Sequence, residues 1–384
     1  MKQKKTLLHF LFVVLLIGNS CSSNDRFVPE SFNLPHESTH RLVERFRISQ
    51  PSPEVFFSTI AIIHILRDGN IVVRNYPEYH LIELNPDGEV VEVISRSGRG
   101  PGELLQATIS FLTKDDSLHI RDAMSRRHLV LAKNEQGEWE VARERVAITV
   151  VDGERVEFIP GRLISGSDHE DYGLFSIYPG QRDTLTKHYT YVAHVDVNLT
   201  RKSDPSRIQP VEDLAIHRTD NSITVSNNNR FFEAFYQYDP VRDEVMYITN
   251  TSNEIIGIDS SGDEFVKGYL PFERFQPDDS DIERSMENST YYYRGMESII
   301  RDKLLPHEPY YRKVILDEER LWIQFSRSDT TQPNWMITTT EGNITATFIG
   351  PGDIERVQIR GQRMYGSVEG SDGTVYLVGY ELTE

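Results

Sequence analysis

Cysteine is almost missing from this sequence: Cys21 is the single cysteine among 384 residues. One cysteine excludes a framework of intramolecular disulfides and a zinc site built from several thiolates. Basic residues are also in deficit, because 41 lysines and arginines face 59 acidic residues and the formal net charge is −18. An excess of negative charge repels phosphate backbones, so we expect no nucleic-acid partner.

Long apolar runs are absent beyond residue 40, so no later segment is expected to cross a membrane as a helix. The one pronounced apolar run, from Leu7 to Ile17, is shorter than the roughly 20 residues that a bilayer requires. It follows three lysines within residues 2–5, and this order is typical of a signal peptide. Small residues then precede Cys21, so the stretch resembles a bacterial lipoprotein signal, whose cysteine carries the lipid. The alternative is an ordinary secretory signal with an incidental cysteine.

These features predict three parts of the chain. Residues 1–20 form the lipoprotein signal peptide, and residues 21–40 contain the lipidated Cys21 and a flexible tether that is polar and holds two prolines. Residues 41–384 form the folded body. The predicted location is the bacterial cell envelope, with the lipid on Cys21 anchoring the protein to a membrane, in our interpretation the outer membrane.

The body repeats one pattern, in which an acidic or glycine-containing turn precedes alternating apolar residues. Alternation with a period of two indicates β-strands. The clearest copies are RDGNIVVRN (67–75), KDDSLHIRD (114–122), EDYGLFSIY (170–178), RDEVMYITN (242–250) and DEERLWIQF (317–325), with a weaker sixth copy at GQRMYGSVE (361–369). Most copies are followed by a second strand, a hairpin turn such as PDG or TEGN, and a third strand. Each unit therefore offers about four strands.

Six such units predict an all-β fold, a six-bladed β-propeller. The last unit supplies only three strands before the chain ends, whereas residues 41–49 form a spare strand at the other end. We expect the N-terminal strand to close the last blade, because this pairing removes an exposed sheet edge. A helical insertion is expected at 279–305, where acidic first-turn residues precede apolar residues at helical spacing.

The segment SRSGRGPGELLQ (95–106) resembles the Gly-Arg-Gly-Pro-Gly-Glu segment of six-bladed β-propeller lipoproteins of Bacteroidota and their relatives. LLPHEPYYRKVILDEERLWIQF (304–325) and the closing TVYLVGYEL are similar to later segments of the same group. The resemblance implies the fold and the envelope location. It implies no reaction, because the family is largely uncharacterised.

Motifs for catalysis or metal binding are scarce. The sequence has no HExxH, no GxSxG and no paired histidines at metal spacing, and NPDGE (85–89) lacks the spaced ligands of a calcium loop. We therefore predict no metal and no cofactor. The GRGPGE segment lacks the ending of a phosphate-binding loop, so it is either a tight crossover, with an ion pair between Arg99 and Glu103, or a ligand contact.

Acidic and basic residues occur in different types of loop. In a propeller, the turns between first and second strands share a face with those between third and fourth strands, and these turns are mainly acidic here. The loops of the opposite, channel-mouth face carry the residues that we predict to bind a ligand: Arg74, Arg96, Arg99, Arg126 and Arg127. Basic loops on an acidic protein suggest an anionic small molecule, a glycan or a protein as partner, or else ordinary surface variation.

The sequence thus predicts an envelope lipoprotein that binds a ligand or partner without catalysis. The rival is an enzyme, because six-bladed propellers also include metal-dependent lactonases and related hydrolases with ligands on the innermost strands of separate blades. The side chains that converge at the centre of the molecule would distinguish the two hypotheses.

Overall fold

The computed structural model describes the folded body with gaps. The described residues are 37–76, 80–112, 116–122, 124–125, 127–146, 149–151, 154–156, 162–165, 171–177, 185–195, 206–219, 222–226, 234–239, 244–249, 252–259, 263–270, 311–317, 319–325 and 331–384. Three predictions lie outside these residues: the signal peptide with Cys21, the helical insertion at 279–305, and the position of Arg126. Within the described ranges every element is a β-strand and none is a helix.

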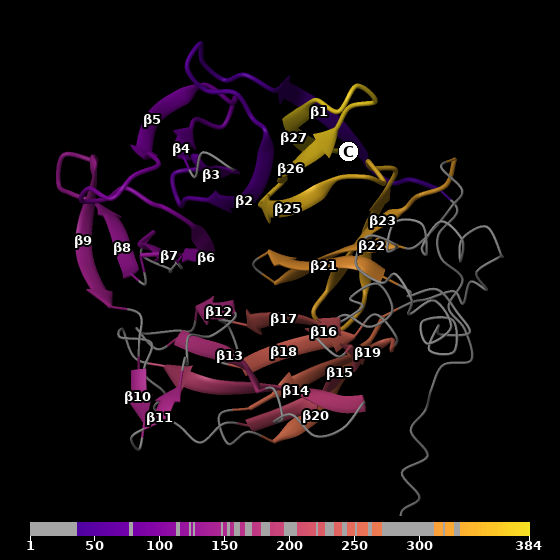
Figure 1. The fold of residues 1–384 in the computed structure, drawn as a ribbon. Helices are drawn as coiled ribbons and strands as arrows, with labels where there is room; N and C mark the ends of the chain where they lie inside the picture. Colours follow the sequence, from indigo (N-terminus) through magenta and orange to yellow (C-terminus); the bar gives the residue numbers. More distant parts are fainter. Residues whose placement is uncertain are drawn as a thin grey trace, which may run out of the picture.

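The strands form antiparallel sheets that follow one another along the chain (Figure 1). Sheet 1 contains β2 (Thr59–Ile65), β3 (Ile71–Tyr76), β4 (His80–Leu84) and β5 (Val90–Ser95). Sheet 2 contains β6 (Ala107–Leu112), β7 (Leu118–Asp122), β8 (Arg127–Lys133) and β9 (Trp139–Val146). In both sheets each strand pairs with the next, as the repeated pattern predicts.

The middle of the chain departs from the four-stranded pattern. A hairpin of β10 (Thr149–Val151) and β11 (Glu154–Val156) precedes sheet 3, which has five strands: β12 (Arg162–Ser165), β13 (Asp171–Ile177), β14 (Leu185–Val195), β15 (Ser206–Thr219) and β16 (Ser222–Ser226). Neither the hairpin nor the fifth strand was predicted. Sheet 4 returns to four strands: β17 (Ala234–Asp239), β18 (Glu244–Thr249), β19 (Glu254–Ile258) and β20 (Glu264–Tyr269).

The last two sheets bring the ends of the described chain together. Sheet 5 contains β21 (Tyr311–Asp317), β22 (Arg320–Phe325), β23 (Trp335–Thr339) and β24 (Ile344–Phe348). Sheet 6 contains β25 (Glu355–Arg360), β26 (Arg363–Glu369) and β27 (Val375–Thr383), and its fourth strand is β1 (Arg41–Ile48). The predicted pairing of the N-terminal strand with the last strand is therefore confirmed.

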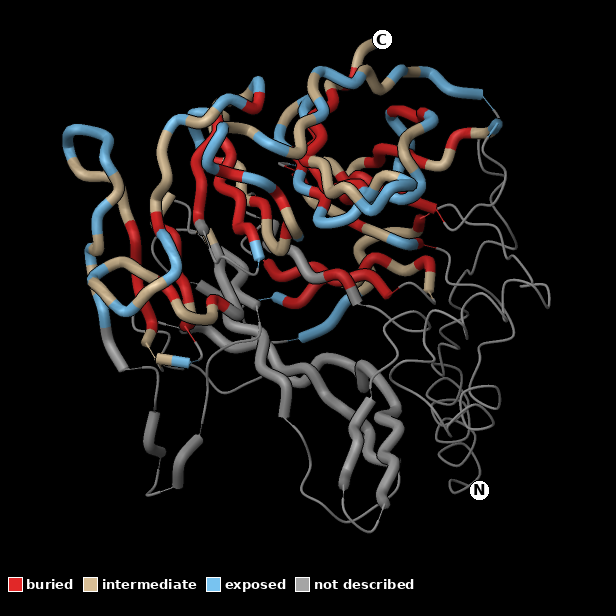
Figure 2. Tube along the Cα trace, turned by 45° about the horizontal axis from the view of Figure 1, so that its top comes forward, coloured by how far each residue is buried: buried red, intermediate tan, exposed pale blue. Residues whose placement is uncertain are grey.

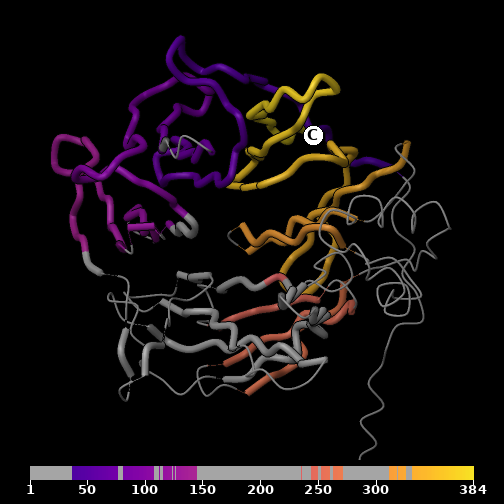
Figure 3. The backbone as a smooth tube through the Cα atoms, in the orientation of Figure 1, coloured from indigo at the N-terminus to yellow at the C-terminus, as the bar shows by residue number. Residues whose placement is uncertain are grey.

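The first strands of the six larger sheets lie side by side around the middle of the molecule. β2 neighbours β6, β6 neighbours β12, and the series continues through β17, β21 and β25 back to β2. Figure 3 shows the yellow C-terminal strands beside the indigo N-terminal ones. This is an all-β, propeller-like arrangement in which loops alternate between two opposite faces.

Apolar clusters lie between sheets 1 and 2, sheets 4 and 5, sheets 5 and 6, and sheets 6 and 1. Figure 2 shows in red the residues that are buried. Between sheets 6 and 1, for example, Ile63 and Val73 pack with Leu377, and Phe46 of β1 joins the same cluster. Residues 71–75 of β3 are all buried, because a central strand is covered on both faces. Burial of apolar side chains in these clusters thus holds the sheets that they join.

The N-terminal segment also contacts a neighbouring sheet. Residues 37–40 were assigned to the tether, but the amide groups of Thr39 and His40 donate to the carbonyl of Thr347 at 2.9 and 3.1 Å. The Thr347 hydroxyl in turn donates to the carbonyl of Glu37 at 2.8 Å. Because Thr347 lies on β24, the chain is attached to sheet 5 before it enters sheet 6.

The turn at NPDGE is a hairpin turn. The Asn85 side chain accepts hydrogen bonds from the amides of Asp87 and Glu89 at 3.0 and 2.9 Å. Gly88 has φ +87°, a conformation that glycine adopts without strain. The polar groups of this turn therefore form hydrogen bonds with one another, as expected for a hairpin turn.

Candidate functional site

The GRGPGE segment forms the crossover from β5 to β6, that is, from sheet 1 to sheet 2. The Glu103 carboxylate accepts a hydrogen bond from the amide of Gly100 at 2.7 Å. It also fills the space over Gly98, where a Cβ atom would lie 2.0 Å from a Glu103 oxygen. Gly102 has φ +75°, and its carbonyl accepts from the Ser95 hydroxyl at 2.6 Å. The glycines are therefore needed for a tight loop.

The expected ion pair between Arg99 and Glu103 is wrong. Glu103 folds back onto the backbone of its own loop, because Gly98 leaves room for its carboxylate. Arg99 is exposed instead, and it forms no ion pair within the described part of the chain. The Glu103 carboxylate is therefore hydrogen-bonded within its own loop, and Arg99 is exposed to solvent.

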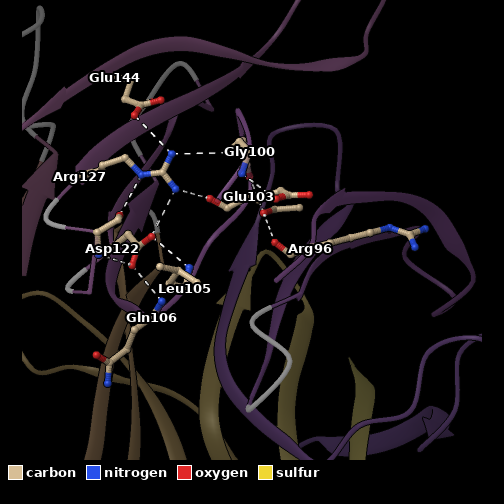
Figure 4. Close-up of polar contacts among 11 residues, drawn as sticks. Arg96, Gly100, Glu103, Leu105, Gln106, Asp122, Arg127 and Glu144 are labelled. Carbon is tan, nitrogen blue, oxygen red and sulfur yellow. Dashed lines mark hydrogen bonds and ion pairs between the residues drawn. The ribbon is translucent and has the colours of Figure 1, made fainter. Parts of the chain in front are cut away.

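Asp122, at the end of β7, anchors the crossover from below. Its buried carboxylate accepts hydrogen bonds from the amides of Leu105 and Gln106 at 3.0 and 2.9 Å (Figure 4). Burial opposes its ionisation, but hydrogen bonds from Ser125, Leu105 and Gln106 outweigh burial and lower the pKa of Asp122. Asp122 is therefore a charged acceptor that positions the loop.

Arg127, the first residue of β8, completes this network. Its Nη2 donates to the carbonyl of Glu103 at 2.7 Å and lies 3.5 Å from Asp122, and its Nη1 lies 3.3 Å from Glu144. Figure 4 shows its guanidinium enclosed by these groups, whereas the Arg96 side chain extends away from them. Arg127 has a structural role that the sequence analysis missed.

The structure separates the predicted ligand-binding arginines into two groups. Arg74 is buried and donates to the carbonyl of Ala107, so it joins β3 to the first residue of β6. Arg127 is held by the crossover network. Arg96 and Arg99 are both exposed, and their side chains form no hydrogen bond or ion pair with any residue that the structure describes.

Exposed apolar side chains lie on the same face as Arg96 and Arg99. Phe56, in the loop before β2, is 53% exposed, Tyr76 at the end of β3 is 46% exposed, and Met124 after β7 is 66% exposed. Strand order places all three at the end of sheets 1 and 2 that carries the crossover. We call this set of five residues the crossover face. These apolar residues could not be identified from the sequence, because the alternating pattern does not distinguish them from core residues.

The opposite face carries the turns between first and second strands. Some of its acidic side chains accept hydrogen bonds from neighbouring turns. The Asp116 carboxylate accepts from the Arg67 amide at 3.1 Å, which joins the turns of sheets 1 and 2. Asp317 accepts from the amide of Gly361 at 2.9 Å, which joins the turns of sheets 5 and 6. We call this the turn face.

A buried carboxylate joins sheets 1 and 2. Glu83 is 1% exposed and accepts from Lys133 Nζ and from the Trp139 ring nitrogen, each at 2.6 Å. These two partners come from β8 and β9, so the network bridges the two layers, and Asn70 before β3 donates a further hydrogen bond to Glu83 at 2.5 Å. It satisfies its buried charge completely, as structural carboxylates do.

The residues that the structure describes contain no group of three or more histidine, cysteine, aspartate or glutamate side chains placed to hold a metal ion. They also contain no helix that is long and apolar enough to span a membrane.

Comparison with known proteins gives structural similarity only. No family model matches the sequence, and no curated protein matches it. A member of the DUF4221 family from Bacteroides vulgatus matches with a TM-score of 0.54 at 11% identity, over 91% of this chain and 100% of the other. A protein from Bacteroides fragilis, described as exported, matches with a TM-score of 0.50 at 12% identity, over 92% and 98% of the two chains. At these identities the chain shares with them an all-β, propeller-like fold.

Proposed function

We propose that this chain is a six-bladed β-propeller lipoprotein of the bacterial envelope, which binds an anionic protein partner through its crossover face. The six larger sheets act as blades, and β1 closes the last of them. The ring of neighbouring first strands supports this interpretation. The proposed role is recognition and not catalysis.

The observation that carries the binding role is the contrast between the two sets of arginines. Arg127 and Asp122 hold the crossover rigidly, so Arg96 and Arg99 project from a fixed base. The exposed guanidinium groups attract an anionic surface locally, against the long-range repulsion from a chain of net charge −18. Phe56, Tyr76 and Met124 on the same face are side-chain types enriched in protein interfaces, which favours a protein over a glycan or a small ion.

Binding of hexaglutamate, measured by calorimetry at low salt, tests this role. We expect Arg96→Ala with Arg99→Ala to weaken binding at least about tenfold, because charge-assisted hydrogen bonds are lost. The matched control is Arg41→Ala with Arg360→Ala, which removes the same charge from exposed positions at the opposite end of the strands. Equal affinities of the two double variants would refute the proposal.

The envelope location rests on the signal-like N-terminus with Cys21, and the exported B. fragilis protein of similar fold is consistent with it. Cys21→Ala should move the protein from the membrane to the soluble envelope fraction. The wild-type protein in the same cells is the control. A variant that still sediments with membranes at high salt would show that the lipid is not the anchor.

A further inference from the structure

A second site lies where the last sheet meets the first, on the turn face. A cleft of about 240 Å³ is formed there by β1, β26 and β27 of sheet 6 and by the turn between β4 and β5 of sheet 1. Phe46 and Pro86 provide apolar walls, and Gly379 forms part of its lining. This volume is below the roughly 300 Å³ of pockets for drug-sized ligands, so the cleft suits a smaller molecule.

A buried hydroxyl lies in this cleft without an ordinary hydrogen bond. Tyr365 is 2% exposed, and its hydroxyl forms no hydrogen bond of ordinary length with a described residue, although the Arg363 guanidinium lies close enough to lower its pKa. Burial raises the pKa of Tyr365, Arg363 opposes the shift, and Asp87 and Glu381 add to it. Because all three charged residues also line the cleft, the hydroxyl lies at its charged end. A buried hydroxyl without a partner is unfavourable unless a ligand or water satisfies it.

The charges of the cleft are only partly paired. Glu381 accepts from Arg45 Nε at 2.6 Å, so these two residues neutralise one another. The Arg363 guanidinium and the Asp87 carboxylate form no ion pair with any residue that the structure describes, although both line the cleft. The cleft therefore offers one cation, one anion and one hydroxyl, beside apolar walls.

We infer that this cleft binds a small zwitterion of amino-acid size. Arg363 and the Tyr365 hydroxyl hold its carboxylate, Asp87 holds its ammonium group, and Phe46 and Pro86 contact its aliphatic part. A guanidinium and a hydroxyl are suitable donors for a carboxylate, and a carboxylate is a suitable acceptor for an ammonium group. The site lies on the face opposite to Arg96 and Arg99, so it is independent of the proposed partner.

Calorimetric titration of the protein without its lipid tests the inference. The three probes share the same branched hydrocarbon chain and differ in their charged groups. L-Leucine carries both charges, 4-methylpentanoate lacks the ammonium group, and 3-methylbutylamine lacks the carboxylate. We expect leucine to bind at least about tenfold more tightly than either analogue, because each analogue leaves one charged group of the cleft unpaired. Arg363→Gln should remove the preference over 3-methylbutylamine, and Asp87→Asn should remove the preference over 4-methylpentanoate, whereas Arg96→Ala with Arg99→Ala should leave both intact. Equal binding of the three probes, or no binding of any, would overturn the inference.

Tyr365→Phe separates a ligand contact from a structural role. The substitution keeps the ring in the core and removes only the hydroxyl, so the melting temperature without ligand should not fall. Leucine affinity should fall by at least about threefold, since one hydrogen bond to the carboxylate is lost. A lowered melting temperature with unchanged leucine affinity would show that the hydroxyl is structural and would overturn its assignment.

Discussion

The ring of Phe46 in the first strand lies directly over Gly379 in the last strand. The two residues are paired in the register of β1 and β27, and a Cβ atom on Gly379 would lie 2.3 Å from the ring. The same ring lies 3.1 Å from the position of a Cβ atom on Gly88, in a turn of sheet 1. Phe46 therefore joins three parts of the chain: the N-terminal strand, the C-terminal strand and the first complete sheet.

This contact predicts coupled effects of mutation. Phe46→Ala should destabilise the protein by about 2 kcal/mol, below the range for a fully buried phenylalanine because the ring is half-buried. Gly379→Ala should also destabilise, since its methyl group displaces the ring. In the Phe46→Ala background Gly379→Ala should cost much less. Denaturant unfolding of the four proteins measures this coupling, and additive effects would contradict the packing described.

Truncation tests the role of the N-terminal segment. Removing residues 22–36 should leave the melting temperature unchanged, whereas removing 22–48 should lower stability far beyond the ~0.5 kcal/mol of surface changes. The longer deletion exposes the edge of β27, uncovers the core beneath Phe46 and removes the hydrogen bonds to Thr347. Calorimetry of both truncations is the measurement. Equal melting temperatures would show that β1 is dispensable.

The Asp122 network predicts a pH dependence. Because the pKa of Asp122 is lowered on folding, its contribution to stability is present above its unfolded value of about 3.9. That contribution is lost as the pH falls from this value toward the folded pKa. Asp122→Asn should therefore be destabilising at pH 7, and its difference from wild type should shrink below about pH 4. Urea unfolding from pH 2 to 7 measures both proteins, and a constant difference would contradict the assignment.

Because Glu83 is buried, we expect loss of its cation alone to reduce stability more than loss of both charges. Lys133→Met leaves the carboxylate buried without its cation, which should cost about 3–5 kcal/mol. Glu83→Gln in the same background removes the uncompensated charge, so the double variant should recover much of the loss. Unfolding free energies of the single and double variants test this. A double variant less stable than Lys133→Met alone would contradict the account of the network.

The sequence predicted most strands because their alternation is strong and their turns are distinctive. Residues 71–75 and the NPDGE turn are examples, and the spare strand at 41–49 correctly predicted the pairing with β27. Sheet 3 was less predictable, since β15 contains Pro210 and several charged residues that weaken its strand signal. The alternating pattern therefore predicts individual strands well, but it does not predict how many strands each sheet contains.

The candidate site was harder to predict, because its arginines differ only in their three-dimensional neighbours. Arg74 and Arg127 are bound by groups of sheet 2 and the crossover, whereas Arg96 and Arg99 have no described partner. The hydrogen bond from Arg74 to the carbonyl of Ala107 cannot be predicted from a sequence pattern, because every residue has a backbone carbonyl. The charge pattern placed several arginines on one face, but it could not show which of them stay exposed there.

Position-specific crosslinking in cells tests the central claim most directly. A photoreactive residue replaces Tyr76 or Met124 on the crossover face, or the exposed Gln136 or Gln362 on the turn face. The account predicts an adduct of one defined mass from Tyr76 and Met124 and none from the two glutamine positions. This adduct should disappear when Arg96 and Arg99 are both changed to alanine. Adducts from the turn face alone, or adducts that persist without the two arginines, would contradict the claim that this face binds the partner.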